Sequence, residues 1–184
     1  DGKSIDTSMG LTPVEGLMMG TRSGDVDPGA LAFLMDKEGL DAKAMSNLVN
    51  KASGVAGISG ISSDMRDIEA AVARGDKRAI LALDMYNLHI VKYVGSYIAE
   101  LNGVDIIVFT GGVGENQAGV RENLCNHLSF MGVEIDKELN DKTRGTETLL
   151  STPASKVKIV VIPTDEELMI ARDTEAIVNG KEPQ

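Results

Sequence analysis

VDIIVFTGGVGENQAGVRENLCNHLSFM, residues 104 to 131, is the stretch that decides the fold. It opens with Val104 to Phe109, a nearly continuous apolar run of strand length, which is typical of a strand buried on both faces of an α/β sheet. We therefore expect this strand near the middle of a sheet. Three glycines follow Thr110, and apolar residues then recur at helical spacing at Val120, Leu124, Leu128 and Met131. The stretch predicts a strand, a glycine-rich turn and a helix.

The predicted turn comprises Gly111, Gly112, Val113, Gly114, Glu115 and Asn116. Glycines leave backbone N–H groups unshielded, and the following helix would direct the positive end of its dipole at a ligand above the strand. A phosphate or a ribose would suit this place, since open α/β sheets bind ligands at the carboxyl ends of their strands. The alternative is a structural crossover that needs glycine for positive φ, with Asn116 as the helix N-cap. The spacing G-G-x-G departs from the dinucleotide fingerprint G-x-G-x-x-G.

Composition limits the classes of function. The chain has 184 residues, of which 42% are apolar and 25% charged, and we expect one domain over 1–184 because no linker divides it. A net charge of −10 argues against nucleic-acid and anionic-membrane partners. No apolar run reaches membrane-spanning length and the first residues are no signal peptide, so we expect a cytoplasmic protein. The single cysteine, Cys125, excludes an internal disulfide.

The sequence before residue 104 predicts one strand and five helices. The strand is the alternating segment 2–8, and the first helix starts at the Thr12 cap and ends by Gly20. The other helices run from Gly29 to Glu38, from the Asp41 cap to Lys51, from Ser62–Asp67 to Arg74, and from 76 to 102. We expect the broad apolar face of the last helix in the core.

Arg22 lies on a loop, residues 20–28, that two glycines and a proline confine between predicted helices. Its planar guanidinium suits a phosphoryl group or a carboxylate. The alternative is a surface arginine paired with Asp25 or Asp27, and the loop taken alone favours that interpretation.

The helix that starts near Asp64 carries Met65 and Arg66 in its first turn. Free N–H groups and an arginine converge there, which suits a nucleotide, although a well-capped structural helix explains the same residues.

After residue 131 the sequence predicts a short strand at 133–135, an exposed polar segment at 137–148 and two strands at 148–152 and 156–162. A last helix follows, with Thr164 and Glu167 as a capping box. That pairing leaves Glu166 free, just past the carboxyl end of a strand, where a Mg²⁺-coordinating carboxylate would lie.

Taken together, four stretches resemble the acetate kinase family, a branch of the sugar kinase, Hsp70 and actin superfamily. The stretches are DTSMGLTPVEGLMMGTRSGDVDP, GISSDMRDIEAA, FTGGVGENQAGVRENLC and VIPTDEELMIARDT, in family order. The resemblance covers essentially the whole chain but only the C-terminal part of the family. It implies a ribonuclease H-like α/β domain with a mixed sheet flanked by helices, and a two-domain kinase whose N-terminal half is absent here.

The resemblance also implies site residues. Arg22 would be the catalytic arginine that stabilises the phosphoryl group in flight. The nucleotide would contact Asp64, Met65 and Arg66, and its adenosine part would lie at Gly111 to Asn116. Glu166 would bind Mg²⁺ or Mn²⁺, and Asp165 departs from the asparagine usual in the family. These roles require Arg22 and Glu166 to converge over the glycine turn.

The implied activity is reversible phosphoryl transfer between ATP and acetate, giving acetyl phosphate and ADP on the way to acetyl-CoA, by a cytoplasmic homodimer. Because the acetate pocket lies in the absent half, we expect no kinase activity from this chain alone. Propionate kinase of the same family is an alternative. Another is a non-catalytic α/β domain whose apolar helices mediate dimerisation.

Overall fold

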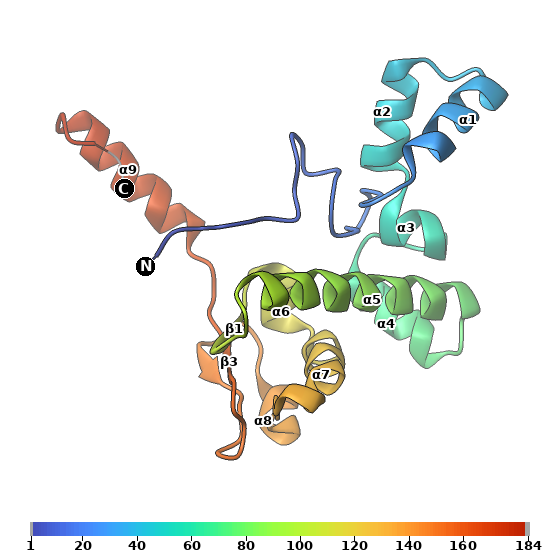
Figure 1. Ribbon diagram of the computed structural model, residues 1–184. Helices are drawn as coiled ribbons and strands as arrows, with labels where there is room; N and C mark the ends of the chain where they lie inside the picture. Colours follow the sequence, from blue (N-terminus) through green and yellow to red (C-terminus); the bar gives the residue numbers. More distant parts are fainter. Residues whose placement is uncertain (1, 183–184) are drawn as a thin grey trace. The chain divides into compact units, whose positions relative to one another are not determined.

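The computed structural model describes residues 2–182, which divide into two compact units at Val104 (Figure 1). The first unit comprises residues up to 104 and the second begins at Asp105. The single-domain assignment of 1–184 stays a prediction, which the number of unfolding transitions would test.

The first unit is helical. Its helices are α1 (Pro28–Glu38), α2 (Ala42–Lys51), α3 (Gly54–Ser59), α4 (Met65–Ala73) and α5 (Lys77–Glu100). Aspartate side chains cap four of them by accepting hydrogen bonds from first-turn N–H groups: Asp27, Asp41, Asp64 and Asp76. The four helices expected over 29–102 are therefore confirmed, and α3 is an addition that the sequence did not indicate.

Packing in the first unit centres on α5, against which α3 and α4 lie. Small side chains make the contact close, because Ala79 and Ala82 of α5 and Ala71 of α4 are fully buried with Val55 and Ile68. The opposite side of α5 is open: Leu81 and Leu88 are about half exposed (52% and 53%). The expectation that the whole apolar face of α5 lies in the core is wrong within this chain.

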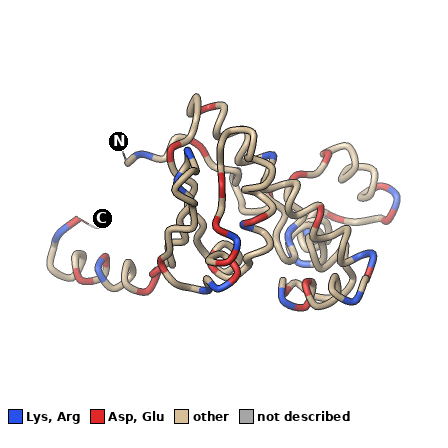
Figure 2. The backbone as a smooth tube through the Cα atoms, turned by 90° about the horizontal axis from the view of Figure 1, so that it is seen from below, with Lys and Arg blue, Asp and Glu red and all other residues tan. Residues whose placement is uncertain are grey.

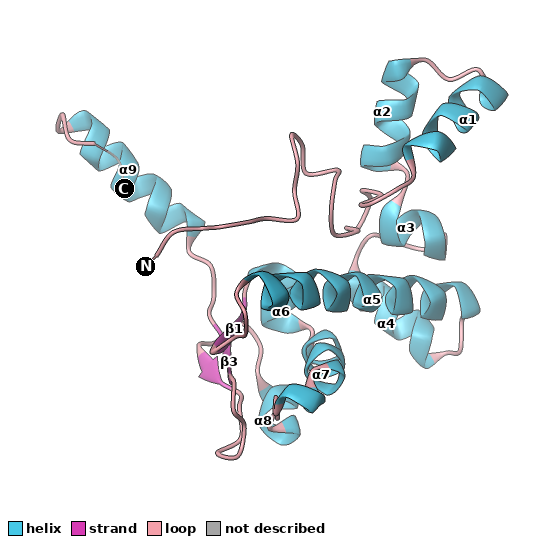
Figure 3. Cartoon of the chain, in the orientation of Figure 1, coloured by secondary structure: helices cyan, strands magenta, loops and turns pink. Residues whose placement is uncertain are grey.

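The segment before α1 is irregular, as the long loop in Figure 3 shows, so the strand at 2–8 and the helix at 12–20 were wrong. Gly16 explains the missing helix, because its φ of +96° is left-handed. A side chain on Gly16 would also collide with the backbone of Ser8, 2.1 Å from the added carbon. The capping pattern at Thr12 yields only a local turn, in which the threonine hydroxyl accepts from Val14 N–H at 3.3 Å.

The second unit contains a small mixed sheet with the strand order β1-β3-β2. Strand β1 (Ile106–Phe109) pairs in parallel with β3 (Lys158–Val161), and β2 (Thr148–Leu149) pairs antiparallel with β3. The chain therefore has a mixed α/β fold that is rich in helices. Strand β1 lies at the edge of this sheet and not in its middle. Its burial alternates, because Ile106 and Val108 are about half exposed.

The second unit also contains the helical segments α6 (Gly111–Asn116), α7 (Ala118–His127), the 3₁₀ turn η1 (Ser129–Met131), α8 (Lys137–Lys142) and α9 (Glu166–Val178). The glycine segment is itself a short helix, so Asn116 is its last residue and not the N-cap of the next helix. The Asn116 side chain instead donates to Gly112 O at 2.9 Å. Most residues of the polar segment 137–148 are exposed, as expected, but its first six residues fold as α8, and Asn140 and Thr143 are buried.

Helix α9 starts one residue later than the capping box implied. Asp165 is the N-cap, and its carboxylate accepts from Leu168 N–H at 3.0 Å, so the Thr164–Glu167 box is wrong. None of the side chains of α9 is buried, and the charged residues along it are mostly acidic, with Arg172 as its one basic residue (Figure 2). Throughout the described residues, no helix combines the length and the apolar character needed to cross a bilayer.

Candidate functional site

The loop that carries Arg22 is a closed structure. Asp25 N–H donates to Gly16 O at 2.9 Å, and the Asp25 carboxylate accepts from Gly16 N–H at 3.0 Å, which closes a loop over residues 16–25 that contains Arg22. The same carboxylate accepts from the hydroxyl of Tyr93 on α5 at 2.6 Å. This hydrogen bond to Asp25 raises the pKa of Tyr93 to about 12. The loop is therefore fixed to the long helix at its C-terminal end.

Backbone hydrogen bonds also fix the middle of the loop to α2 and α3. Ser23 N–H donates to Val49 O at 2.9 Å, and Thr21 O accepts from Ser53 N–H at 3.0 Å. Gly54, with φ +63°, lies directly against the loop, because an added side-chain carbon would meet Met19 O at 2.2 Å and Arg22 O at 2.7 Å. These contacts leave the Arg22 backbone little freedom.

Arg22 is half-buried, and its guanidinium forms no ion pair with any carboxylate of the described residues. Its hydrogen-bonding contact is with the sulfur of Met19 at 3.6 Å. The interpretation of Arg22 as a surface arginine paired with Asp25 or Asp27 is wrong, because Asp25 binds Gly16 and Tyr93 while Asp27 caps α1. A cation on a rigid loop thus keeps its donors available for an anionic ligand.

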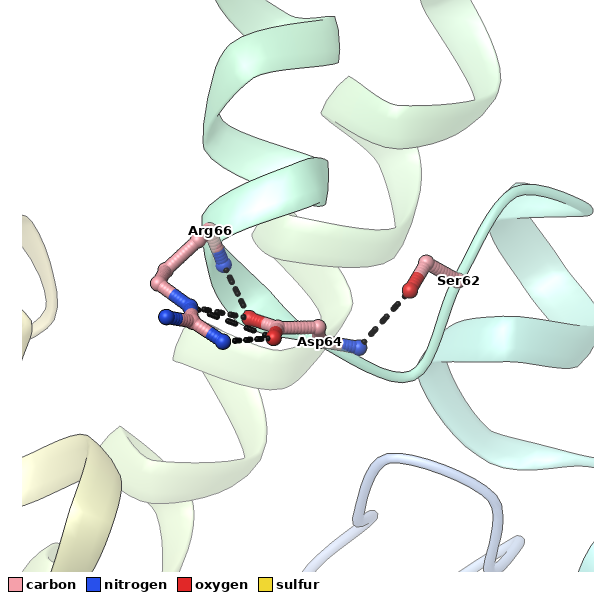
Figure 4. Close-up of polar contacts among 3 residues, drawn as sticks. All are labelled: Ser62, Asp64 and Arg66. Atoms are coloured by element: carbon pink, nitrogen blue, oxygen red, sulfur yellow. Dashed lines mark hydrogen bonds and ion pairs between the residues drawn. The ribbon is translucent and has the colours of Figure 1, made fainter.

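Asp64 and Arg66 form a bidentate ion pair at the start of α4 (Figure 4). Arg66 Nε lies 3.0 and 3.1 Å from the two carboxylate oxygens, and Arg66 N–H donates to Asp64 Oδ1 at 2.9 Å. Hydrogen bonds from the Arg66 side chain and backbone lower the pKa of Asp64 to about 2. The pair is exposed, so the guanidinium is accessible to a ligand while the carboxylate holds it at the helix N-terminus.

The glycine segment of α6 is joined to the end of β3. The carboxylate of Glu115 accepts two hydrogen bonds from Thr164, one from its N–H and one from its hydroxyl, both at 2.9 Å. Those bonds, the backbone one first, lower the pKa of Glu115 below its ordinary value. Because Thr164 lies two residues before Glu166, the contact holds the first turn of α9 to the glycine segment.

Glu166 is the first residue of α9 and its side chain is exposed. Neighbouring Asp165 uses a carboxylate oxygen for the helix cap, and Glu166 and Glu167 are the acids of the first turn. A surface groove of about 400 Å³ is lined by Thr164, Asp165, Glu166, Met169 and Ile170. The described residues contain no cluster of three metal-ligating side chains. A single carboxylate fits Mg²⁺ that is bound mainly by substrate phosphates and water.

The sequence and fold of the chain match those of a known protein family. The sequence model described as "Acetokinase family" matches residues 1–172. The chain belongs to the acetokinase family. Acetate kinase of Parabacteroides distasonis is 62% identical over 181 residues, which are 98% of this chain and 45% of that protein. Acetate kinase of Phocaeicola vulgatus is 65% identical over 179 residues, again 45% of its length. The chain thus spans a little under half the length of these curated acetokinases.

Solved acetokinase structures share the fold. The crystal structure of Porphyromonas gingivalis acetate kinase matches with a TM-score of 0.91 and 58% identity, over 96% of this chain and 44% of that one. A propionate kinase from Francisella tularensis matches with a TM-score of 0.85 and 46% identity, over 93% of this chain and 43% of that one.

The residues that the family resemblance implies for the site fall into two groups. Arg22 and Asp64 to Arg66 lie in the first unit, whereas Gly111 to Asn116 and Glu166 lie in the second. The Glu115–Thr164 contact brings the two second-unit positions close together. The convergence of Arg22 on them stays a prediction.

Sequence reasoning does not identify the residues that hold these candidate segments in place. It considers Asp25 only as an ion-pair partner and gives Tyr93 no role. Arg121 carried a signal that could have identified it, because it lies at helical spacing with Cys125 and Leu128, both of which are buried. A charged residue on the buried stripe of a helix indicates a hydrogen-bonded polar cluster in the core.

Proposed function

We propose that this chain is the nucleotide-binding half of an acetate kinase, which transfers a phosphoryl group reversibly between ATP and acetate. The observation that carries the proposal is the free guanidinium of Arg22 on a loop fixed at both ends, in a chain of the acetokinase family. A rigid, unpaired arginine suits a transition state whose charge spreads over three equatorial oxygens.

Each remaining site residue has a role in this proposal. Arg66, oriented by Asp64, meets the nucleotide together with Met65 at the start of α4. The segment Gly111, Gly112, Val113, Gly114, Glu115 and Asn116 meets its adenosine part. Glu166 holds Mg²⁺ or Mn²⁺, which would neutralise phosphate charge when bound. In-line transfer also requires acetate in a closed cleft, and we assign the acetate pocket to the other half of the enzyme.

Binding of nucleotide gives the first test. Mg·ADP added to the isotopically labelled 184-residue chain should shift the amide resonances of Asp64 and Gly112. The Arg66→Ala variant should weaken this binding by roughly tenfold, about the value of one charged hydrogen bond. Lys77→Ala, on a neighbouring helix start, serves as the matched control. If Mg·ADP shifts neither amide, the chain is better described as a non-catalytic α/β domain that associates through the apolar side chains of α5.

Catalysis gives the second test. The 184-residue chain alone should not turn over acetyl phosphate and Mg·ADP, whereas a protein in which it is joined to the N-terminal half of an acetokinase should. There, Arg22→Ala should lower kcat about 10³-fold, as for other arginines that meet a transferring phosphoryl group. Turnover by the 184-residue chain above that of its own Arg22→Ala variant would contradict the assignment of the acetate pocket to the other half.

Propionate kinase is the second candidate, because a propionate kinase shares 46% identity and the same fold over this region. The ratio of kcat/KM for acetate and propionate in the joined protein would decide between them. An extra methylene is worth about 1–3 kcal/mol in a fitted pocket, which is a ratio of about 10 to 200. We further propose that the protein acts in the cytoplasm as a homodimer whose interface includes Leu81 and Leu88.

A further inference from the structure

Arg121, on α7, is the largest fully buried side chain among the described residues. Burial lowers the pKa of its guanidinium, and no carboxylate of the described residues lies within ion-pair distance of it. A buried charge is costly unless hydrogen bonds satisfy it. The hydrogen bonds of the Arg121 guanidinium therefore indicate its role in the structure.

Three of the four hydrogen bonds of Arg121 bind the C-terminal end of α8. Nε donates to Asn140 Oδ1 at 2.7 Å, and Nη2 donates to Asn140 O at 2.9 Å and Thr143 O at 3.0 Å. Asn140 is itself fully buried and donates to Ala118 O, in the first turn of α7, at 3.0 Å. This network fixes α8 against α7.

The fourth hydrogen bond has a different direction. Arg121 Nη1 donates to Gly114 O, in the glycine segment, at 2.9 Å. The next carbonyl, Glu115 O, accepts from Gly145 N–H at 3.2 Å, just beyond α8. Arg121 and Gly145 thus orient two successive peptide planes of the segment, and Thr164 holds the Glu115 side chain. Glycines resist reorientation less than other residues, so these outside contacts set the conformation of the segment.

We propose that Arg121 is a positioning residue for the nucleotide: through Gly114 it orients the segment Gly111 to Asn116 against the adenosine part. This inference rests on the proposed function. Arg121 cannot touch the nucleotide, because its side chain has no exposed surface. It acts through the peptide plane that follows Gly114. A role limited to holding α8 would need only the three bonds to Asn140 and Thr143.

Two variants separate positioning from stability. Arg121→Met has a similar volume and loses all four hydrogen bonds. Asn140→Ala loses the side-chain bonds of the same network but leaves the guanidinium on Gly114. Both should lower the midpoint of thermal unfolding. Only Arg121→Met should also weaken Mg·ADP binding by the folded chain, by roughly tenfold, with Asn140→Ala within about twofold of the wild type. Equal affinity in all three proteins, or equal losses in both variants, would overturn the inference.

A measurement on the wild-type chain covers the case in which Arg121→Met does not fold. Mg·ADP should shift the Arg121 Nε–H resonance together with the Gly114 and Glu115 amides. If the Asp64 amide shifts on titration and these three resonances do not, the proposed function stands and the positioning role of Arg121 is wrong. If no resonance of the chain responds to Mg·ADP, both the function and the positioning role are wrong.

Discussion

Thr164 donates both its backbone N–H and its hydroxyl to the carboxylate of Glu115, across 49 residues of sequence. Parallel pairing of β1 with β3 makes the contact possible, because Glu115 follows the end of β1 and Thr164 follows the end of β3. The two strand ends that the family resemblance associates with adenosine and metal binding are thereby linked by one carboxylate.

The Glu115–Thr164 contact should make the second unit less stable in acid. The pKa of Glu115 is lower in the folded protein than its ordinary value of 4.5. The stabilisation by this contact is therefore complete above pH 4.5, and it is lost as the pH falls from there through the lowered pKa. The free energy of unfolding, measured with denaturant from about pH 6 to about pH 3, should fall with pH in the wild type and should fall less in Glu115→Gln. An equal pH dependence in both proteins would show that the bonded carboxylate contributes nothing.

Gly54 should be essential for the Arg22 loop because the loop backbone packs directly against it, and not only because its φ is positive. Gly54 and Gly39 have almost the same φ, +63° and +65°, but a side chain at Gly39 would meet nothing within 4 Å. Alanine at either position should cost about 1–2 kcal/mol for the left-handed backbone. Gly54→Ala must also displace the backbone of Met19 and Arg22, so its total should exceed that of Gly39→Ala by about 2 kcal/mol or more. Chemical denaturation measures both, and similar losses would refute the close approach.

Tyr93→Phe should loosen the loop that carries Arg22, because it removes the donor to Asp25. We expect a loss of about 1–2 kcal/mol and faster amide hydrogen exchange over residues 16–25. Tyr97→Phe is the control, since the two rings contact each other at a centroid distance of 6.2 Å and only Tyr93 binds Asp25. The raised pKa of Tyr93 adds a second test. The hydrogen bond from Tyr93 to Asp25 contributes fully to stability below pH 10.0, the ordinary pKa of tyrosine, and this contribution is lost as the pH rises through about 12.

Cys125 should resist thiol reagents in the folded protein. Burial raises the pKa of its thiol from 9.0 to about 12, and the side chain is 2% exposed. At about pH 8 the thiolate fraction should therefore be roughly a thousandfold below that of an ordinary thiol. Reaction with a disulfide reagent should follow unfolding of the second unit, so its rate should rise with denaturant. Rapid labelling without denaturant would contradict the burial of α7.

Much of the local structure could be predicted from the sequence. Aspartates at the helix starts identified α1, α2, α4 and α5, and Gly39 marked the end of α1, because capping acts within a few residues of the chain. The order of β1, the glycine segment and the following helix was readable for the same reason. Two patterns failed where distant contacts outweighed local preference. The capping box at Thr12 gave way to the left-handed Gly16, and Thr164 binds Glu115 instead of capping α9.

By itself, the sequence determined the family, the positions of most helices and which residues could carry the chemistry, because motifs and caps are local. Only the tertiary structure decided what those residues contact. It occupied Asp25 with Tyr93, it joined Glu115 to Thr164, and it buried Arg121 against Gly114. The physical reason is competition: each carboxylate or carbonyl has few bonding positions, and the packing of distant segments settles which donor occupies them.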